Sequence, residues 1–171
     1  MRRIPSLLLI LLLGAGAAGN GRAQTNAPAH APGGPDPRVK QVLEGAGLKY
    51  KIDPQTADFQ LLIPLKEGRS QTVIINSQTA RVGTVEIRRV WSPAYTASAP
   101  LSAELANNLL RDSFLKKLGS WALLDSGKLH TLCFLAELSP TADRATLLTT
   151  VVMVAGVADQ KEKEITRKDL L

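Results

Sequence analysis

The stretch from Phe59 to Ile75, FQLLIPLKEGRSQTVII, contains the pattern that decides the fold. Its first half places alternate apolar residues on one face of a predicted strand: Phe59, Leu61, Ile63 and Leu65. The Lys66-Glu67-Gly68 segment then marks a turn, after which Val73 and Ile75 share one face of a second strand. A turn of a few residues between two alternating runs predicts an antiparallel hairpin.

Further strands are expected on both sides of this hairpin. Before it, Leu48, Tyr50 and Ile52 alternate with lysines and lead into an Asp53-Pro54 turn. After it, residues 84–90 read as a strand, with the side chains of Val85 and Ile87 facing inward and those of Glu86 and Arg88 facing outward. Toward the C-terminus, residues 121–124 and 129–138 form a second hairpin around Asp125-Ser126-Gly127.

Three helices complete the pattern. The first begins with Asp36 as its capping residue and Pro37 at its first position, and Gly47 supplies a left-handed end. The second begins after Ser102 and ends at Gly119. Its apolar stripe consists of Leu105, Ala106, Leu109, Leu110 and Phe114, with Leu118 below them.

The third helix is predicted to begin at Ser139-Pro140 and to run to about Asp159. The charged tail, residues 161–171, either extends this helix or frays. The order is then helix, strands, helix, two strands, helix. This predicts an α+β domain over residues 36–160, with an antiparallel sheet whose helices cover one face.

The N-terminus has the layout of an export signal. Two arginines follow Met1, residues 7–13 read LLLILLL, and small residues lead to Ala23. This layout predicts a signal peptide over residues 1–23 with cleavage after Ala23, or alternatively after Ala18. Residues 24–35 then read as a flexible linker rich in Pro, Gly and Ala. The mature protein is therefore expected to be periplasmic or secreted, with no stable membrane insertion after cleavage, because the apolar run is too short to span a bilayer.

The export signal also changes the charge argument. The chain has 21 basic and 15 acidic residues, which gives +6, but three of the arginines lie in the signal and leave about +3. No concentrated basic face with interleaved aromatic residues is evident in the sequence. A nucleic-acid partner is therefore not expected.

Candidates for catalysis are few. His130 and Cys133 lie three residues apart in a predicted strand, so their side chains should point to opposite faces. Two scattered histidines and one cysteine do not supply the convergent ligands of a metal site, and no Gly-rich phosphate loop occurs in the domain. We therefore expect no catalytic residues, no metal and no cofactor, and Cys133 is best interpreted as a packed thiol.

Two features indicate a binding surface. Arg88, Arg89, Trp91 and Tyr95 follow one another at the end of a predicted strand and in the loop after it. Arg, Trp and Tyr are the residues that most often anchor interfaces, so these four are the candidate partner-binding residues. The alternative is that Trp91 packs in the core and the arginines form a solvated edge.

The strand over residues 129–138 is the second feature, because it is apolar on both faces. One face holds Leu129, Thr131, Cys133 and Leu135, and the other holds Leu132, Phe134, Ala136 and Leu138. One face should meet the helices, and the other should be covered by the same chain or by a second subunit.

The chain resembles the YbjN family, described as bacterial sensory-transduction regulators, whose fold is similar to that of type III secretion chaperones. The resemblance covers most of the domain and is carried by short segments: LEGAGLKYKID (43–53), DFQLLIPL (58–65), GRSQTVIIN (68–76), VEIRRVWS (85–92) and VVMVAGVADQKEKE (151–164). It implies a small α+β binding domain, often dimeric, with no established chemistry. An export signal departs from the cytoplasmic setting of secretion chaperones.

The function expected from the sequence is that of an exported, non-enzymatic domain that recognises a protein or peptide in the bacterial envelope as a homodimer. An envelope stress or sensory regulator is the alternative that the family resemblance implies. A hydrolase or redox enzyme whose site is assembled from distant residues is a further alternative, with Cys133 and His130 as its best candidates.

Overall fold

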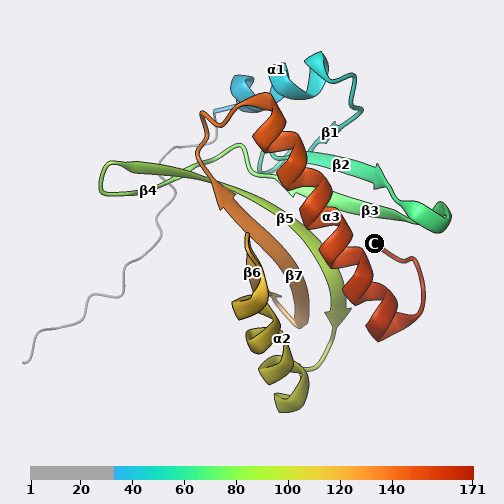
Figure 1. Ribbon diagram of the computed structural model, residues 1–171. Coiled ribbons are helices and arrows are strands. Elements are labelled where there is room, and N and C mark those ends of the chain that lie inside the picture. Colours follow the sequence, from blue (N-terminus) through green and yellow to red (C-terminus); the bar gives the residue numbers. More distant parts are fainter. Residues whose placement is uncertain (1–32) are drawn as a thin grey trace, which may run out of the picture.

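The structure is a computed structural model that describes residues 33–171. The predicted signal peptide, residues 1–23, and the linker up to residue 32 lie outside the described residues. In chain order the elements are α1 (Pro37–Gly45), β1 (Lys51–Ile52), β2 (Phe59–Pro64), the 3-10 turn η1 (Lys66–Gly68), β3 (Ser70–Ile75), β4 (Ala80–Val82), β5 (Val85–Ala97), α2 (Ala103–Leu115), β6 (Ser120–Ser126), β7 (Leu129–Leu138) and α3 (Arg144–Thr166). Figure 1 shows these elements on the ribbon.

The strands form one antiparallel sheet in the order β1-β2-β3-β5-β7-β6, and β4 pairs only with β5. Together with the three helices, this sheet confirms the predicted α+β class. The β2–β3 hairpin lies where the alternation placed it, with Phe59 opposite Ile75 and Leu61 opposite Val73. The predicted strand at residues 48–52 is reduced to the two residues of β1.

One face of the sheet carries the hydrophobic core. The register sets Ile75 beside Val90, and Val90 beside Ala136, so these side chains share that face. The helices add buried residues to the same cluster: Val39 and Leu43 from α1, Leu109 from α2, and Leu147, Val151, Val154, Ala155 and Ala158 from α3. We call the opposite side of the sheet the open face.

The first helix confirms the capping prediction. The backbone N–H of Arg38 donates to Asp36 Oδ1 over 2.8 Å, Pro37 is the first helical residue, and Gly47 follows the helix with φ +69°. This arrangement satisfies a free donor at the start of the helix and turns the chain sharply toward β1. Asp36 also has a role beyond the cap, because its carboxylate meets the side chain of Arg88.

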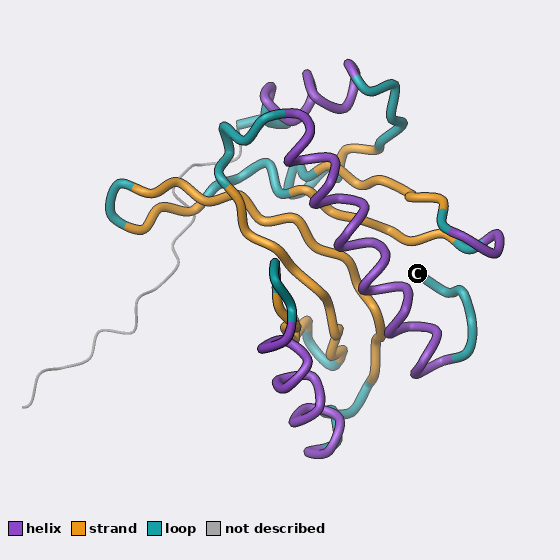
Figure 2. The backbone as a smooth tube through the Cα atoms, in the orientation of Figure 1, coloured by secondary structure: helices purple, strands orange, loops and turns teal. Residues whose placement is uncertain are grey.

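Strand β5 corrects two predictions. It continues to Ala97, so Trp91 and Tyr95 lie within the strand and not in a loop after it. Its inward and outward residues are also reversed at the start: Arg88 is buried and Val85 is exposed. The reason is that Val85 belongs to the β4–β5 hairpin, which extends away from the rest of the sheet (Figure 2), whereas Arg88 finds an ionic partner in the interior.

Strand β3 pairs with β5 over only two residues, Ile74 with Trp91 and Ile75 with Val90. Beyond that point Pro93 offers no N–H, and the β5–β7 register shifts between Pro93 and Tyr95. The first half of β3 therefore has an edge that β5 does not pair with. The hydroxyl of Ser92 donates to the carbonyl of Thr72 over 2.6 Å and joins the two strands across the gap.

Helix α2 begins as predicted, because Ser102 Oγ accepts the backbone N–H of Leu105 over 3.2 Å. Its apolar stripe is not a core face, however. Leu109 is buried with 4% of its surface exposed, whereas Leu110 is 67% and Phe114 is 89% exposed. The stripe is wider than the part of the helix that meets β6.

The prediction for the start of α3 was wrong. The helix begins at Arg144, and its cap is Asp143, whose Oδ1 accepts the N–H of Thr146 over 2.7 Å. Ser139 and Pro140 lie in the turn before the helix, where the N–H of Ala142 donates to the carbonyl of Ser139. The helix also continues past Asp159 to Thr166, so the first part of the tail extends it.

Candidate functional site

The four predicted partner-binding residues are divided between the two faces of β5. Arg88 is 1% exposed and faces the core side, where Tyr95 also packs against the hydrophobic cluster. Arg89 and Trp91 point to the open face, as their pairing with Glu137 and Leu135 shows. The alternation of a strand separates neighbouring residues in this way, so the four residues do not form one surface.

Arg88 is the centre of a buried polar network. Its Nη2 donates to Asp36 Oδ2 over 2.5 Å, and its Nη1 donates to the carbonyl of Asn76. Arg38 adds a second guanidinium, which lies 2.7 Å from Asp36 and 3.2 Å from Glu86. Burial raises the pKa of Asp36, but the hydrogen bonds from Arg38 and Arg88 outweigh it and hold that pKa well below its usual range. The carboxylates of Asp36 and Glu86 balance the two guanidinium charges, and the network ties α1 to β5.

Arg89 and Trp91 border a shallow depression on the open face. It has a volume of about 300 Å³, and its lining is Asn76, Arg89, Trp91, Ala122, Leu123, Leu124, Cys133 and Leu135. Arg89 pairs with Glu137 over 2.7 Å at the surface. Trp91 lies beside Ile74 on one neighbouring strand and Leu135 on the other. The depression therefore combines an apolar floor, an indole ring and a guanidinium, which suits an apolar side chain with a polar neighbour.

Cys133 and His130 lie on opposite faces of β7, as predicted. The thiol of Cys133 is buried and donates to the carbonyl of Ala122 over 3.6 Å. Burial raises the pKa of this thiol to about 11, so it is protonated at neutral pH. His130 Nδ1 lies 2.7 Å from Asp125 Oδ1 at the β6–β7 turn. The two side chains do not form a nucleophile–base pair.

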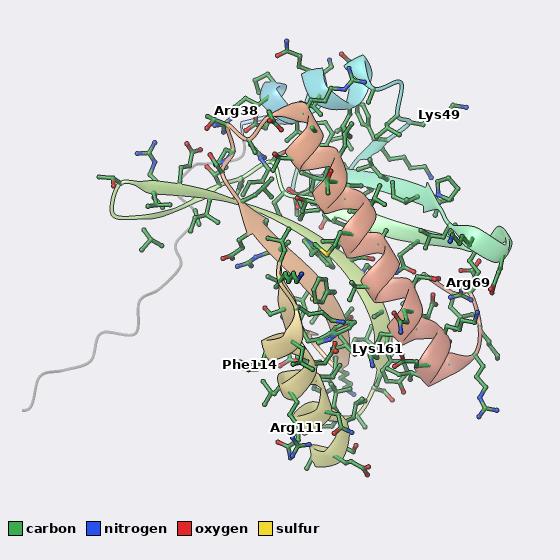
Figure 3. All side chains as sticks on the ribbon, viewed as in Figure 1. Arg38, Lys49, Arg69, Arg111, Phe114 and Lys161 are labelled. Atoms are coloured by element: carbon green, nitrogen blue, oxygen red, sulfur yellow. The ribbon has the colours of Figure 1, made fainter. Side chains whose placement is uncertain are left out.

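A larger apolar surface lies around α2 and the β6–β7 hairpin. Seven of the twelve large apolar side chains that are exposed within the described residues gather there. We call this set the α2–β6 surface: Leu110, Phe114, Leu115, Leu118, Leu123, Leu124 and Leu129. Figure 3 shows Phe114 on the outer side of α2, away from the sheet.

A groove runs through the α2–β6 surface. Its volume is about 280 Å³, and it is lined by Pro100, Leu101, Ala106, Leu109, Leu110, Trp121, Ala122, Leu123 and Leu132. Strand β6 is the outermost strand at this end of the sheet. It has neither a proline nor a lysine, the residues that usually protect an exposed edge. The groove is therefore open to a further protein segment, whereas α2 covers the edge of β6 at Trp121, whose N–H donates to Ser113 Oγ over 3.0 Å.

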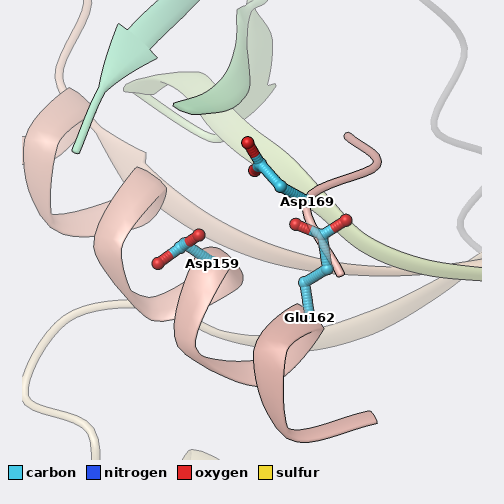
Figure 4. Close-up of side chains that lie close together, drawn as sticks. All are labelled: Asp159, Glu162 and Asp169. Atoms are coloured by element: carbon cyan, nitrogen blue, oxygen red, sulfur yellow. The ribbon is translucent and has the colours of Figure 1, made fainter. Parts of the chain in front are cut away.

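Three carboxylates form a separate cluster near the end of α3. Asp159, Glu162 and Asp169 each offer an oxygen within 4.8 Å of the others (Figure 4). The guanidinium of Arg69 lies 2.6 Å from Asp159, 3.2 Å from Glu162 and 3.8 Å from Asp169. Burial raises the pKa of Glu162, while the N–H of Leu170 and the charge of Arg69 act in the opposite direction. Arg69 supplies the positive charge that a cation would bring, so we interpret the cluster as an ion-pair hub.

No protein-family model and no curated protein sequence matches this chain. None of the helices within residues 33–171 combines the length and the apolar character that crossing a membrane requires.

The sequence showed the apolar stripe of α2 but not its exposure, so the α2–β6 surface was missed. A signal was present, because Leu109, Leu110 and Phe114 spread over more of the helix circumference than one packing face needs. No local signal pointed to the Arg69 hub, whose members lie about ninety residues apart in the sequence.

Proposed function

We propose that this protein is an exported, non-enzymatic domain that recognises a protein or peptide in the bacterial envelope and acts as a homodimer. The observation that carries the proposal is the concentration of exposed large apolar side chains on the α2–β6 surface. Such a patch on a domain that already has a complete core is a mark of protein association. The resemblance to the YbjN family is in line with this function.

The α2–β6 surface is the proposed contact between two copies of the chain. Fully burying one large apolar side chain removes roughly 60–120 Å² of apolar area, the area equivalent to its transfer free energy. Strand alternation turns Leu124 and Leu129 toward the open face, so five of the seven side chains lie on the side of α2. These five provide about 190–380 Å² on each copy, which is a large part of the apolar area of a standard interface. A twofold contact needs a self-complementary surface, and an uncharged apolar helix stripe fulfils this requirement.

Light scattering coupled to size-exclusion chromatography tests the dimer. Phe114→Ser removes the most exposed apolar side chain of α2, and we expect it to convert the dimer to a monomer. Val152→Ser is the matched control, because Val152 is 59% exposed but lies on α3, outside the α2–β6 surface. A chain that is monomeric at high concentration, or a dimer that survives Phe114→Ser, contradicts this assignment.

The depression on the open face is the proposed site for the partner, and it adjoins the α2–β6 surface because Leu123 and Leu124 belong to both. Arg89 and Trp91 carry over from the sequence-based candidates, whereas Arg88 is enclosed in the core. Trp91→Ala and Arg89→Ala should each weaken partner capture from a periplasmic extract while thermal unfolding stays cooperative. Arg81→Ala is the control, because Arg81 is an exposed arginine of β4, away from the depression. If all three variants capture the partner equally well, the depression is not the partner-binding site.

Within residues 33–171, Cys133 and His130 do not form a nucleophile–base pair, which supports the non-enzymatic part of the proposal. The buried thiol of Cys133 is protonated at neutral pH and hydrogen-bonded to a carbonyl. Because Cys133 lines the depression, the variant for this test changes His130 alone, and His130→Ala should leave partner capture unchanged. A loss of capture in the folded His130→Ala chain would contradict the placement of the partner at the depression.

A further inference from the structure

The segment after α3 returns to the sheet and lies along β3. Arg167 adopts a left-handed conformation with φ +58°, which reverses the chain at the end of the helix. The carbonyl of Leu171 then accepts the backbone N–H of Thr72 over 3.3 Å. This contact falls on the part of β3 that β5 does not pair with. We call residues 168–171 the strap.

Four polar groups of the domain form hydrogen bonds with four successive residues of the strap. Arg69 Nη1 donates to the carbonyl of Lys168 over 2.9 Å, and the N–H of Ser70 donates to Asp169 Oδ1 over 3.4 Å. Glu162 Oε1 accepts the N–H of Leu170 over 2.7 Å, and Thr72 holds the carbonyl of Leu171. Three of these contacts are to backbone atoms and one is to a carboxylate. The set therefore specifies a tetrapeptide with an acidic second residue.

The groups that bind the strap are held in place without it. Arg69 is fixed by Asp159 and Glu162, both of which belong to α3. Ser70 and Thr72 are fixed by their pairing with Pro64 and Leu62 of β2. Removing the strap takes Asp169 out of the hub, but the ion pairs of Arg69 with α3 and the pairing of β3 with β2 remain. The rest of the slot is therefore preorganised for an occupant.

The strap itself is weakly anchored. Leu170 is 64% exposed and Leu171 is only partly buried, so few apolar contacts hold them. The two strand contacts, at 3.3 and 3.4 Å, are at the long end of the hydrogen-bond range. A segment held mainly by polar contacts at the surface opens at low free-energy cost.

We propose that this slot binds an X-Asp-X-X segment of a partner protein, which lies along β3 in place of the strap. The three contacts to backbone atoms supply affinity, and the guanidinium of Arg69 with the N–H of Ser70 favours an acidic second residue. The strap competes with the partner within the same chain. Its effective concentration of about millimolar sets the level that a partner segment must exceed.

This slot would be a second peptide-binding site of the protein. The inference rests on the proposed function only in taking the bound segment from a partner protein. The slot is separate from both the open-face depression and the α2–β6 surface. The probe below is a synthetic peptide and not a cellular partner. If the peptide does not bind, the assignments of the depression and the α2–β6 surface still stand. If those two assignments are wrong, the peptide can still bind the slot.

Fluorescence anisotropy with the full chain tests the slot. The probe is a labelled peptide containing Lys-Asp-Leu-Leu flanked by glycines, and the control peptide replaces its Asp with Asn. Asp169→Asn weakens the strap without touching the slot, so this variant should bind the probe about tenfold more tightly than the unchanged chain. The Asn peptide should bind the variant about tenfold more weakly than the probe does.

Arg69→Gln should abolish probe binding. If this variant fails to fold, hydrogen exchange of the Thr72 amide in the Asp169→Asn chain takes its place: exchange should be faster than in the unchanged chain and should slow again when the probe is added. The proposal is overturned if the folded Asp169→Asn chain binds the probe no more tightly than the unchanged chain, or if the Asn peptide binds as well as the probe.

Discussion

Two regions of the molecule treat polar and apolar side chains in opposite ways. Around Arg88 and Arg69, charged groups are buried and paired within the chain. On the α2–β6 surface, large apolar side chains lie in solvent. In an ordinary domain the charged groups are outside and the large apolar ones inside. The arginine networks are complete without a partner, whereas the α2–β6 surface becomes a normal interior only when another protein segment covers it.

The largest effect should come from breaking the Arg88 network. Arg88→Ala leaves the buried carboxylate of Asp36 without its closest partner, and we expect a loss of about 3–5 kcal/mol in the free energy of unfolding, measured by urea denaturation. Arg89→Ala is the matched control on the next residue, whose ion pair with Glu137 is exposed. It should change stability little. Similar losses in both variants would contradict the division of β5 into a buried and an open side.

The contrast within α2 can be tested with two neighbouring leucines. Leu109→Ala should cost about 2–5 kcal/mol, because it opens a cavity in the core. Leu110→Ala should leave the stability of the monomer nearly unchanged, since this side chain is exposed. Denaturation at low protein concentration separates the two effects. An equal loss for Leu110→Ala at that concentration would show that its side chain is packed within the monomer.

Gly119, the residue before β6, tests how closely the chain approaches β7 at this end of the sheet. It has φ +85°, and a Cβ there would lie 2.4 Å from the carbonyl oxygen of Leu135. Gly119→Ala should therefore lower the melting temperature, at a cost of about 2 kcal/mol or more. Gly127→Ala is the control, because Gly127 has φ +62° but open space around it, so it should lose only the smaller conformational part. A larger loss at Gly127 would contradict the close approach of β6 to β7 at Leu135.

The smallest effect is the pH dependence of the Arg88 network. The pKa of Asp36 is lower in the folded chain than its usual value of 3.8, so the carboxylate stabilises the fold above that pH and the contribution is lost as the pH falls. Below pH 3.8 the free energy of unfolding should decrease by up to about 1.4 kcal/mol per pH unit from this group. Asp36→Asn should flatten this part of the curve. If the free energy of unfolding of Asp36→Asn decreases just as steeply at acidic pH, other carboxyl groups cause the decrease.

Local patterns predicted the parts of the fold that local forces determine. Asp36, Pro37 and Ser102 marked helix starts correctly, because a cap acts within one turn of its own helix. The start of α3 was missed because Ser139 and Asp143 are both good caps, and only tertiary packing selects between them.

Contacts between distant residues were beyond the sequence pattern. The partner of Arg88 lies 52 residues away, so its burial could not be inferred from the alternation of β5. The expected strand over residues 84–90 was too short, because β5 continues through Pro93 to Ala97 at the point where β3 diverges. The candidate site was predicted in part: Arg89 and Trp91 share a surface, while Arg88 and Tyr95 face the core side.

The position of α3 has a consequence for how the protein is made. This last helix crosses β3, β5 and β7 and contributes Leu147, Val151 and Val154 to the core. When the ribosome has completed β7, the core face of the sheet is therefore not yet covered by α3. The core can be buried only after residues 144–158 emerge. We expect the nascent chain to remain open until α3 has been synthesised. If the N-terminus is an export signal, the chain would reach a translocation channel in the unfolded state that threading requires.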